Sequence, residues 1–183
     1  MEQLKELKEL NTMLQATLKA RSPKITEELI QILNGTAITM LPTYEKSDIA
    51  SFNFEYRHEW FSIVFFGSNA RGLTITEPIS LLFNDLNEYH SKSEDVMDEM
   101  DELEENLEDD TDEWEDMMDE YNEEKNEIYE NWFVGCWEEA RSQTQNTTPT
   151  YFSIEELDCG TELVSSDYVE INKNQSVIRY YTH

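Results

Sequence analysis

One stretch of this chain, residues 94–130, concentrates negative charge to a degree that limits what it can fold into. It contains 21 Asp and Glu residues against the single base Lys125, a formal charge of −20. The other 146 residues hold 20 acids and 12 bases, a formal charge of −8. Like charges one helical turn apart destabilise a helix by a few tenths of a kcal/mol per pair. A folded structure here therefore needs an apolar face that outweighs this repulsion.

The acidic stretch has such a face. Apolar residues recur through it at three- and four-residue spacing, which is typical of a packed helix. Residues Asp109 to Thr111 with Glu113 could cap a second helix, so one helix of about 40 residues and a helical hairpin that bends near 109–111 both remain open. A disordered acidic segment is the third alternative that stays open, although the regular apolar face favours a helix. The members of the face are Val96, Met100, Leu103, Leu107, Trp114, Met117, Tyr121, Ile128 and Trp132.

The N-terminal part of the chain predicts a helical hairpin. Leucines at three- and four-residue spacing predict a first helix over roughly residues 2–20. Ser22 and Pro23 are typical of an N-cap and a first-turn proline, so they are expected to start a second helix. Asn34 and Gly35 are expected to end it with a left-handed C-cap.

Strands are predicted on both sides of the acidic stretch, from alternating or continuous apolar runs. Pro78 is expected to open a helix whose apolar residues are Ile79, Leu82, Phe83, Leu86 and Tyr89, with the same pattern continuing past Ser93 into the acidic stretch. Because helices and strands come in blocks, the pattern favours an α+β fold with an antiparallel sheet over a doubly wound one. We expect a single domain, 1–183, with an acidic helical insertion over 94–130. The expected strands cover 36–41, 49–56, 60–66, 73–75, 151–154, 168–171 and 177–181, the last two joined as a hairpin.

The overall charge excludes several classes of partner. A net charge of −28 and a pI near 4.1 repel phosphates and anionic lipids, so direct binding to nucleic acid or to a membrane is excluded. No apolar run approaches the ~20 residues that span a bilayer. The segment Met1–Leu7 lacks the basic start and apolar middle of a signal peptide, which predicts a cytoplasmic location. A reduced setting is the simpler interpretation of Cys136 and Cys159, but a disulfide between them stays open.

The sequence offers no catalytic or metal-binding constellation. It lacks a P-loop, a dinucleotide-binding glycine motif, a nucleophile elbow and a zinc-protease motif, so we expect a non-enzyme without a cofactor. His58 and His90 are isolated in the sequence. The acids of 109–113 lack the Gly and Glu spacing of a calcium-binding EF-hand loop, so no dedicated metal site is expected.

Regularly spaced carboxylates on a rigid helix can imitate a phosphate backbone, which carries one negative charge per ~1.7 Å of duplex. The sequence therefore predicts an inhibitor that occupies the basic, nucleic-acid-binding surface of a partner protein, with aromatic and Met side chains as anchors. A solvated helix face and an acidic scaffold or chaperone for basic proteins are the competing interpretations. A monomer and a homodimer paired along the Met and Trp seam both remain open. The residues expected to contact the partner are Glu94, Asp98, Asp101, Glu102, Glu105, Glu108, Asp109, Asp112, Trp114, Glu115, Asp116 and Asp119.

Two resemblances to known kinds of protein indicate which class of partner to expect. Residues 131–140 (NWFVGCWEEA) followed by 149–153 (PTYFS) resemble a pattern in small acidic bacterial immunity proteins, where an aromatic-Cys-Trp helix end precedes a polar loop and a short strand. This resemblance implies an antidote in the bacterial cytosol that binds a secreted toxin, often a nuclease. By charge alone, the acidic stretch is similar to phage or plasmid DNA-mimic proteins that block restriction or CRISPR enzymes in a host cell. Neither resemblance transfers individual binding residues.

Overall fold

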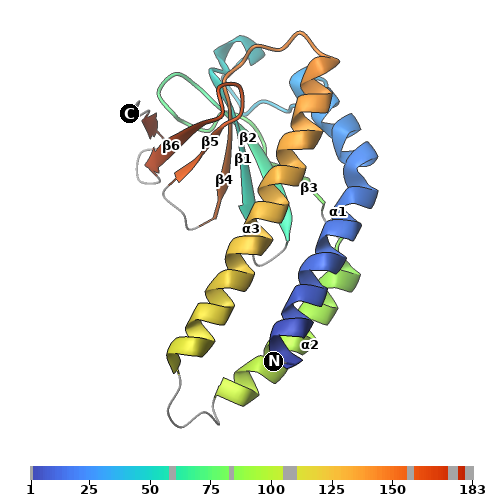
Figure 1. The fold of residues 1–183 in the computed structure, drawn as a ribbon. Coiled ribbons are helices and arrows are strands. Elements are labelled where there is room, and N and C mark those ends of the chain that lie inside the picture. Colours follow the sequence, from blue (N-terminus) through green and yellow to red (C-terminus); the bar gives the residue numbers. More distant parts are fainter. Residues whose placement is uncertain are drawn as a thin grey trace. The chain divides into compact units, whose positions relative to one another are not determined.

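The computed structural model describes residues 2–57, 61–82, 85–104, 111–155, 159–172 and 177–179. It has an α+β fold in which helices α1 (Glu2–Leu33), α2 (Asn87–Glu104) and α3 (Thr111–Ser142) accompany one mixed sheet (Figure 1). The chain divides into two compact units. Unit 1 comprises Met1–Pro23 and Asn84–Gly135, and unit 2 comprises Lys24–Phe83 and Cys136–His183. The division falls within α1 and α3, so each of these helices contributes to both units.

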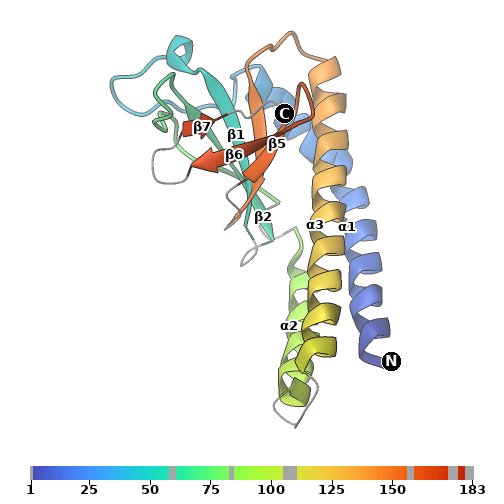
Figure 2. The same cartoon turned by 60° about the vertical axis from the view of Figure 1, so that its left-hand side comes forward.

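Unit 1 is built from three helical segments that lie side by side (Figures 1 and 2). The acidic stretch forms two helices, α2 and α3, so the single helix of about 40 residues is wrong. The expected bend near 109–111 falls largely on residues outside the described part of the chain. The apolar face of the acidic stretch is confirmed in part, since Met100 and Tyr121 are buried and Val96, Met117 and Ile128 are half-buried. The core of unit 1 is lined by Leu7, Leu10, Leu14, Leu18, Leu86, Tyr89, Met100, Tyr121, Tyr129 and Phe133.

The expected N-terminal helical hairpin is wrong, because α1 continues through Pro23 as one helix. A proline inside a helix costs about 3 kcal/mol. The apolar seam explains why the helix continues: Leu18 and Ile25 are fully buried and lie seven residues, or two turns, apart on one face. Each such buried side chain contributes about 1.5–3 kcal/mol, so the seam on both sides of Pro23 outweighs the lost hydrogen bond.

The end of α1 agrees with the sequence. Gly35 adopts a left-handed conformation with φ of +70°. Its N–H donates to the carbonyl of Ile32 at 2.8 Å, and the N–H of Thr36 donates to the carbonyl of Gln31 at 2.9 Å. These two bonds form a Schellman motif, which confirms the predicted left-handed C-cap.

Unit 2 contains one seven-stranded sheet in the order β3-β2-β1-β4-β5-β6-β7. The central pair, β1 and β4, is parallel, with Phe54 opposite Phe152, so the expected purely antiparallel sheet is wrong. Strands that follow one another through tight turns pair antiparallel, whereas a long connection that contains helices allows a parallel return. Both α2 and α3 lie between β1 and β4 in the sequence. The strands are β1 (Ser51–Arg57), β2 (Ser62–Ser68), β3 (Ile79–Leu81), β4 (Thr150–Ile154), β5 (Cys159–Glu162), β6 (Asp167–Asn172) and β7 (Val177–Arg179), and η1 (Lys46–Asp48) is a short 3-10 helix before β1.

Most sequence-predicted strands correspond to β1, β2, β4, β6 and β7, and the antiparallel pairing of β6 with β7 confirms the expected C-terminal hairpin. The expected strands 36–41 and 73–75 form only isolated bridges, from Met40 to Thr76 and from Ser68 to Thr74. The helix start predicted at Pro78 is wrong, because Ile79–Leu81 is β3 and pairs antiparallel with β2. The later part of that predicted helix, which includes Tyr89, is confirmed as α2. A strand of three residues is too short for periodicity to reveal. β5 was not expected.

Candidate protein-binding surface

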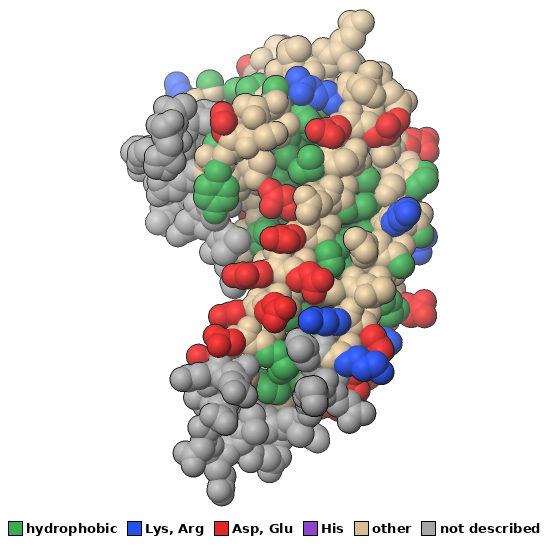
Figure 3. Space-filling model, viewed as in Figure 1, with side chains coloured by type: hydrophobic (Ala, Val, Ile, Leu, Met, Phe, Trp, Pro, Cys, Tyr) green, Lys and Arg blue, Asp and Glu red, His purple; other side chains and the backbone are tan. Residues whose placement is uncertain are grey.

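The charge of the chain is divided unequally between the two units. By sequence, unit 1 holds 26 acids and 6 bases, a formal charge of −20, whereas unit 2 holds 15 acids and 7 bases, a formal charge of −8. Figure 3 shows Asp and Glu side chains gathered along α3. The negative field of the molecule therefore originates mainly in unit 1.

Between residues 115 and 127, helix α3 carries seven exposed carboxylates. They form two rows that follow the i, i+4 spacing of the helix. They span twelve helical steps, or about 18 Å, which corresponds to one charge per about 3 Å. A single nucleic-acid strand carries one phosphate per about 3.4 Å of duplex axis. The carboxylate rows, as we call them, are Glu115, Asp119, Glu123 and Glu127 in one row and Asp116, Glu120 and Glu124 in the other.

Helix α2 adds further exposed carboxylates. Glu94 and Asp98 are exposed and lie one turn apart, as do Asp95 and Glu99. The Glu94 Oε2 atom lies 3.1 Å from the Nδ1 atom of His90. Both acidic helices of unit 1 therefore carry negative charge to the solvent.

The structure places about half of the sequence-predicted contact residues. Glu94, Asp98, Glu115, Asp116 and Asp119 are exposed on α2 and α3. The backbone of three others lies in α2 or α3, but their side chains are outside the described part: Asp101, Glu102 and Asp112. Glu105, Glu108 and Asp109 lie outside the described residues altogether, and Trp114 is half-buried on α3. The sequence prediction missed the later members of the carboxylate rows, which the i, i+4 spacing counted onward from Glu115 would have identified: Glu120, Glu123, Glu124 and Glu127.

Hydrogen bonds from α1 and α2 hold α3 in place within unit 1. The buried Asn11 on α1 donates through Nδ2 to the Glu124 Oε2 atom at 2.7 Å and to the Tyr121 carbonyl at 3.4 Å. The hydroxyl groups of Tyr89 on α2 and Tyr121 on α3 lie 3.2 Å apart. The carboxylate rows are therefore presented by a helix that is anchored on two sides.

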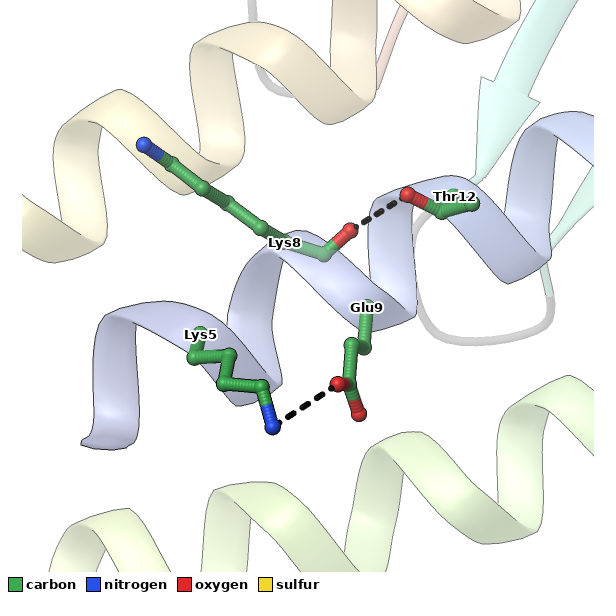
Figure 4. A network of polar contacts seen from close by, with 4 residues as sticks. All are labelled: Lys5, Lys8, Glu9 and Thr12. Atoms are coloured by element: carbon green, nitrogen blue, oxygen red, sulfur yellow. Dashed lines mark hydrogen bonds and ion pairs between the residues drawn. The ribbon is translucent and has the colours of Figure 1, made fainter.

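Helix α1 carries bases beside this acidic surface. Lys5 forms an exposed ion pair with Glu9 at 3.4 Å, one turn along α1, and Thr12 donates to the carbonyl of Lys8 at 2.8 Å (Figure 4). Figure 4 shows the Lys8 side chain extending toward α3. Lys8 and Glu120 line one small cavity of about 10 Å³. Helix α1 thus supplies a cation next to the carboxylate rows.

Lys125, the base within the acidic stretch, is half-buried on α3. Its Nζ atom lies 5.0 Å from the centroid of the Tyr121 ring and donates to Asn122 Oδ1 at 2.8 Å. Burial lowers the pKa of the Lys125 ammonium from 10.5 to about 8. This ammonium contacts an aromatic ring and an amide, whereas the exposed carboxylates of α3 face the solvent.

A larger groove of about 420 Å³ lies between α1 and α3 in unit 1. Trp132 in its wall is fixed by a hydrogen bond from Nε1 to the Ser22 hydroxyl at 2.9 Å and by an edge contact with the Tyr129 ring at 6.5 Å. No sequence pattern predicted this groove, because it exists only where α1 lies against α3. The groove is lined by Gln15, Leu18 and Lys19 from α1 and by Glu124, Glu127, Ile128, Asn131 and Trp132 from α3.

Neither metal-binding groups nor similar proteins point to another functional site in the part of the chain that the structure describes. Among the residues that the structure describes, no three or more His, Cys, Asp and Glu side chains are grouped to hold a metal ion. No helix in the described ranges is long and apolar enough to cross a membrane. Comparisons with family models, curated proteins and solved structures find no match to this chain. The acidic surface of unit 1 is therefore the candidate functional site.

Proposed function

We propose that this protein is a non-enzymatic inhibitor that occupies the basic, nucleic-acid-binding surface of a partner protein. The observation that carries the proposal is the spacing of the carboxylate rows. Seven exposed charges at about 3 Å per charge match the linear density of one phosphate strand. A groove whose Lys and Arg side chains are spaced for phosphates finds acceptors at a similar interval on α3.

The way unit 1 holds α3 favours tight binding. Buried contacts and hydrogen bonds from Asn11 and Tyr89 fix the helix before a partner arrives. A preformed helix avoids the ordering cost that a disordered acidic segment would incur on binding. The net charge of unit 1 also steers a cationic partner toward this surface and raises the association rate.

The partner we propose first is a nuclease toxin, for which this chain is the immunity protein. The same surface would serve a phage or plasmid protein that inhibits a restriction, CRISPR or other defence enzyme. Neighbouring genes separate these two settings, since a toxin gene supports the first and phage early genes support the second. An acidic scaffold or chaperone would instead bind many basic proteins without competing for one nucleic-acid site.

The test compares two variants that lose the same charge from different units. The first removes four charges from the carboxylate rows: Glu115→Gln, Asp116→Asn, Asp119→Asn and Glu123→Gln. The control removes four exposed charges from unit 2: Glu27→Gln, Glu77→Gln, Glu138→Gln and Asp167→Asn. Partners are captured from the source cell at low and high salt, and the affinity of each purified partner is then measured with and without competing duplex DNA or RNA.

The row variant is expected to bind about tenfold or more weakly and with a smaller salt dependence, because each lost pair contributes up to about 1 kcal/mol. The control is expected to bind nearly as tightly as the unmodified protein. Equal weakening of both variants, or binding that nucleic acid does not displace, would contradict the proposal.

A further inference from the structure

The groove between α1 and α3 lies where the carboxylate rows end. The last members of the two rows, Glu124 and Glu127, both line the groove. Beyond them, the wall of α3 changes from acidic to apolar with Ile128 and Trp132. A cationic segment of a partner protein that lies along the rows therefore reaches a groove that is lined by two carboxylates and an aromatic ring.

These side chains match the chemistry of an arginine better than that of a lysine. A guanidinium group is planar, stacks on an aromatic face and donates to carboxylates in a fixed two-pronged geometry. Tryptophan is the best aromatic partner for such a cation. The aliphatic stem of the arginine can lie along Leu18 and Ile128, which also line the groove.

Two contacts prepare the groove for this ligand. Trp132 is held by its bond to Ser22 at 2.9 Å, and Glu124 is held by the bond from Asn11 at 2.7 Å. Lys19 stands on the α1 side of the groove and repels a cation there. The guanidinium group is therefore directed to the α3 side, where the two carboxylates and the indole ring lie.

We propose that this groove binds one arginine side chain of the basic partner, with Trp132 as the stacking surface and Glu124 and Glu127 as the acceptors. The inference rests on the proposed function, since it names the residue type by which the same acidic surface is recognised. It adds a specific anchor to a surface that otherwise attracts cations by charge density.

The test uses two peptide probes of equal charge, nona-arginine and nona-lysine, with the full-length protein. Affinities are measured for the unmodified protein and for Trp132→Leu. Glu127→Gln, in the groove, is compared with its matched control Glu123→Gln, which removes an exposed charge one turn away outside the groove. In a nitrogen–proton NMR spectrum, the Trp132 indole signal is identified by its loss in Trp132→Phe and followed during titration with nona-arginine.

The unmodified protein is expected to bind nona-arginine about three- to tenfold more tightly than nona-lysine. Trp132→Leu is expected to abolish this preference while its nona-lysine affinity stays within about twofold and its far-UV circular dichroism spectrum matches that of the unmodified protein. Glu127→Gln is expected to weaken nona-arginine binding about threefold more than Glu123→Gln. Lys19→Gln is expected to strengthen it.

Equal affinity for the two peptides, equal effects of the two Glu→Gln variants, or an unmoved Trp132 signal at saturation would overturn the arginine site and leave the proposed function intact. Failure of both peptides to bind would overturn the proposed function and the arginine site together.

Discussion

The half-buried Lys125 makes the stability of this protein depend on pH in a range where carboxylates no longer titrate. Burial lowers its pKa from 10.5 to about 8. Below pH 8 the ammonium is charged in both states, and the folded protein bears the full cost of burying it. Between pH 8 and 10.5 the folded state releases the proton while the unfolded state keeps it. Because the unfolded state then binds more protons, the free energy of unfolding rises with pH through this window.

The shift from 10.5 to about 8 sets the size of this rise. At 1.36 kcal/mol per pH unit, it corresponds to a gain of about 3 kcal/mol between pH 7 and pH 11. Lys125→Met removes the titrating group and keeps a side chain of similar length. At pH 7 this variant avoids the burial cost but also loses the contact with the Tyr121 ring, which is worth about 0.5–2 kcal/mol. Its net gain at pH 7 is therefore expected to be below 3 kcal/mol.

The measurement is urea denaturation followed by far-UV circular dichroism at half-unit steps from pH 7 to pH 11. Other lysines and tyrosines are common to both proteins and cancel in the difference between them. The unmodified protein should gain about 3 kcal/mol relative to Lys125→Met across the window. Lys125→Arg, which stays charged throughout, serves as a second reference and should give the same difference. A difference that stays constant with pH against both references would refute the assigned burial of the ammonium.

Three other substitutions test the packing and the charge of the fold by urea and thermal denaturation. Gly67→Ala should destabilise by about 1–3 kcal/mol, because the new Cβ would lie 2.8 Å from the Thr76 methyl carbon; unchanged stability would refute this close approach. Gly135→Ala should stabilise by about 0.5–1 kcal/mol, because nothing beyond the adjoining backbone of α3 lies within 4 Å of the new Cβ in the interior of this helix; a loss of stability would show a hidden clash. Combining Asp116→Asn with Glu120→Gln should stabilise by about 0.5–1 kcal/mol at low salt, and a gain that persisted in 1 M NaCl, where the screening length is about 3 Å, would argue against charge repulsion as its cause.

Local patterns in the sequence predicted the structure correctly where the contacts within one short segment determine it. The alternation through Phe52, Phe54 and Tyr56 predicts β1, and all three side chains are buried. The Asn34-Gly35 pair predicts the end of α1 in the same way. In each case the determining contacts lie within a few residues of the signal.

The sequence prediction failed where distant segments decide the outcome. Ser22 and Pro23 carry a strong signal for a helix start, yet the buried seam from Leu18 to Ile25 keeps α1 continuous. The parallel pairing of β1 with β4 depends on the path of the chain through α2 and α3, which no periodicity reports. Local propensity is a weak preference that tertiary packing overrides.

One part of the candidate surface could be predicted from the sequence and the other could not. The exposure of the carboxylate rows follows from the helical spacing of the acids, so the sequence predicted the first members of the rows, Glu115, Asp116 and Asp119. The groove could not be predicted, because Leu18 and Trp132 are more than a hundred residues apart and meet only when α1 packs against α3. The charge pattern depends on the sequence of one helix, whereas the groove depends on how two helices pack together.

The repulsion along α3 is tolerable because packing exceeds it. The carboxylate rows contain five like-charged i, i+4 pairs, which together cost about 1–2.5 kcal/mol at low salt. Burial of Tyr121, Tyr129 and Phe133 on the same helix contributes about 1.5–3 kcal/mol for each side chain. The core therefore holds the charges together in the free protein, and a cationic surface that covers the rows removes the repulsion. Binding then gains both the attraction of opposite charges and the relief of like ones, without the ordering cost that a disordered acidic tail would add.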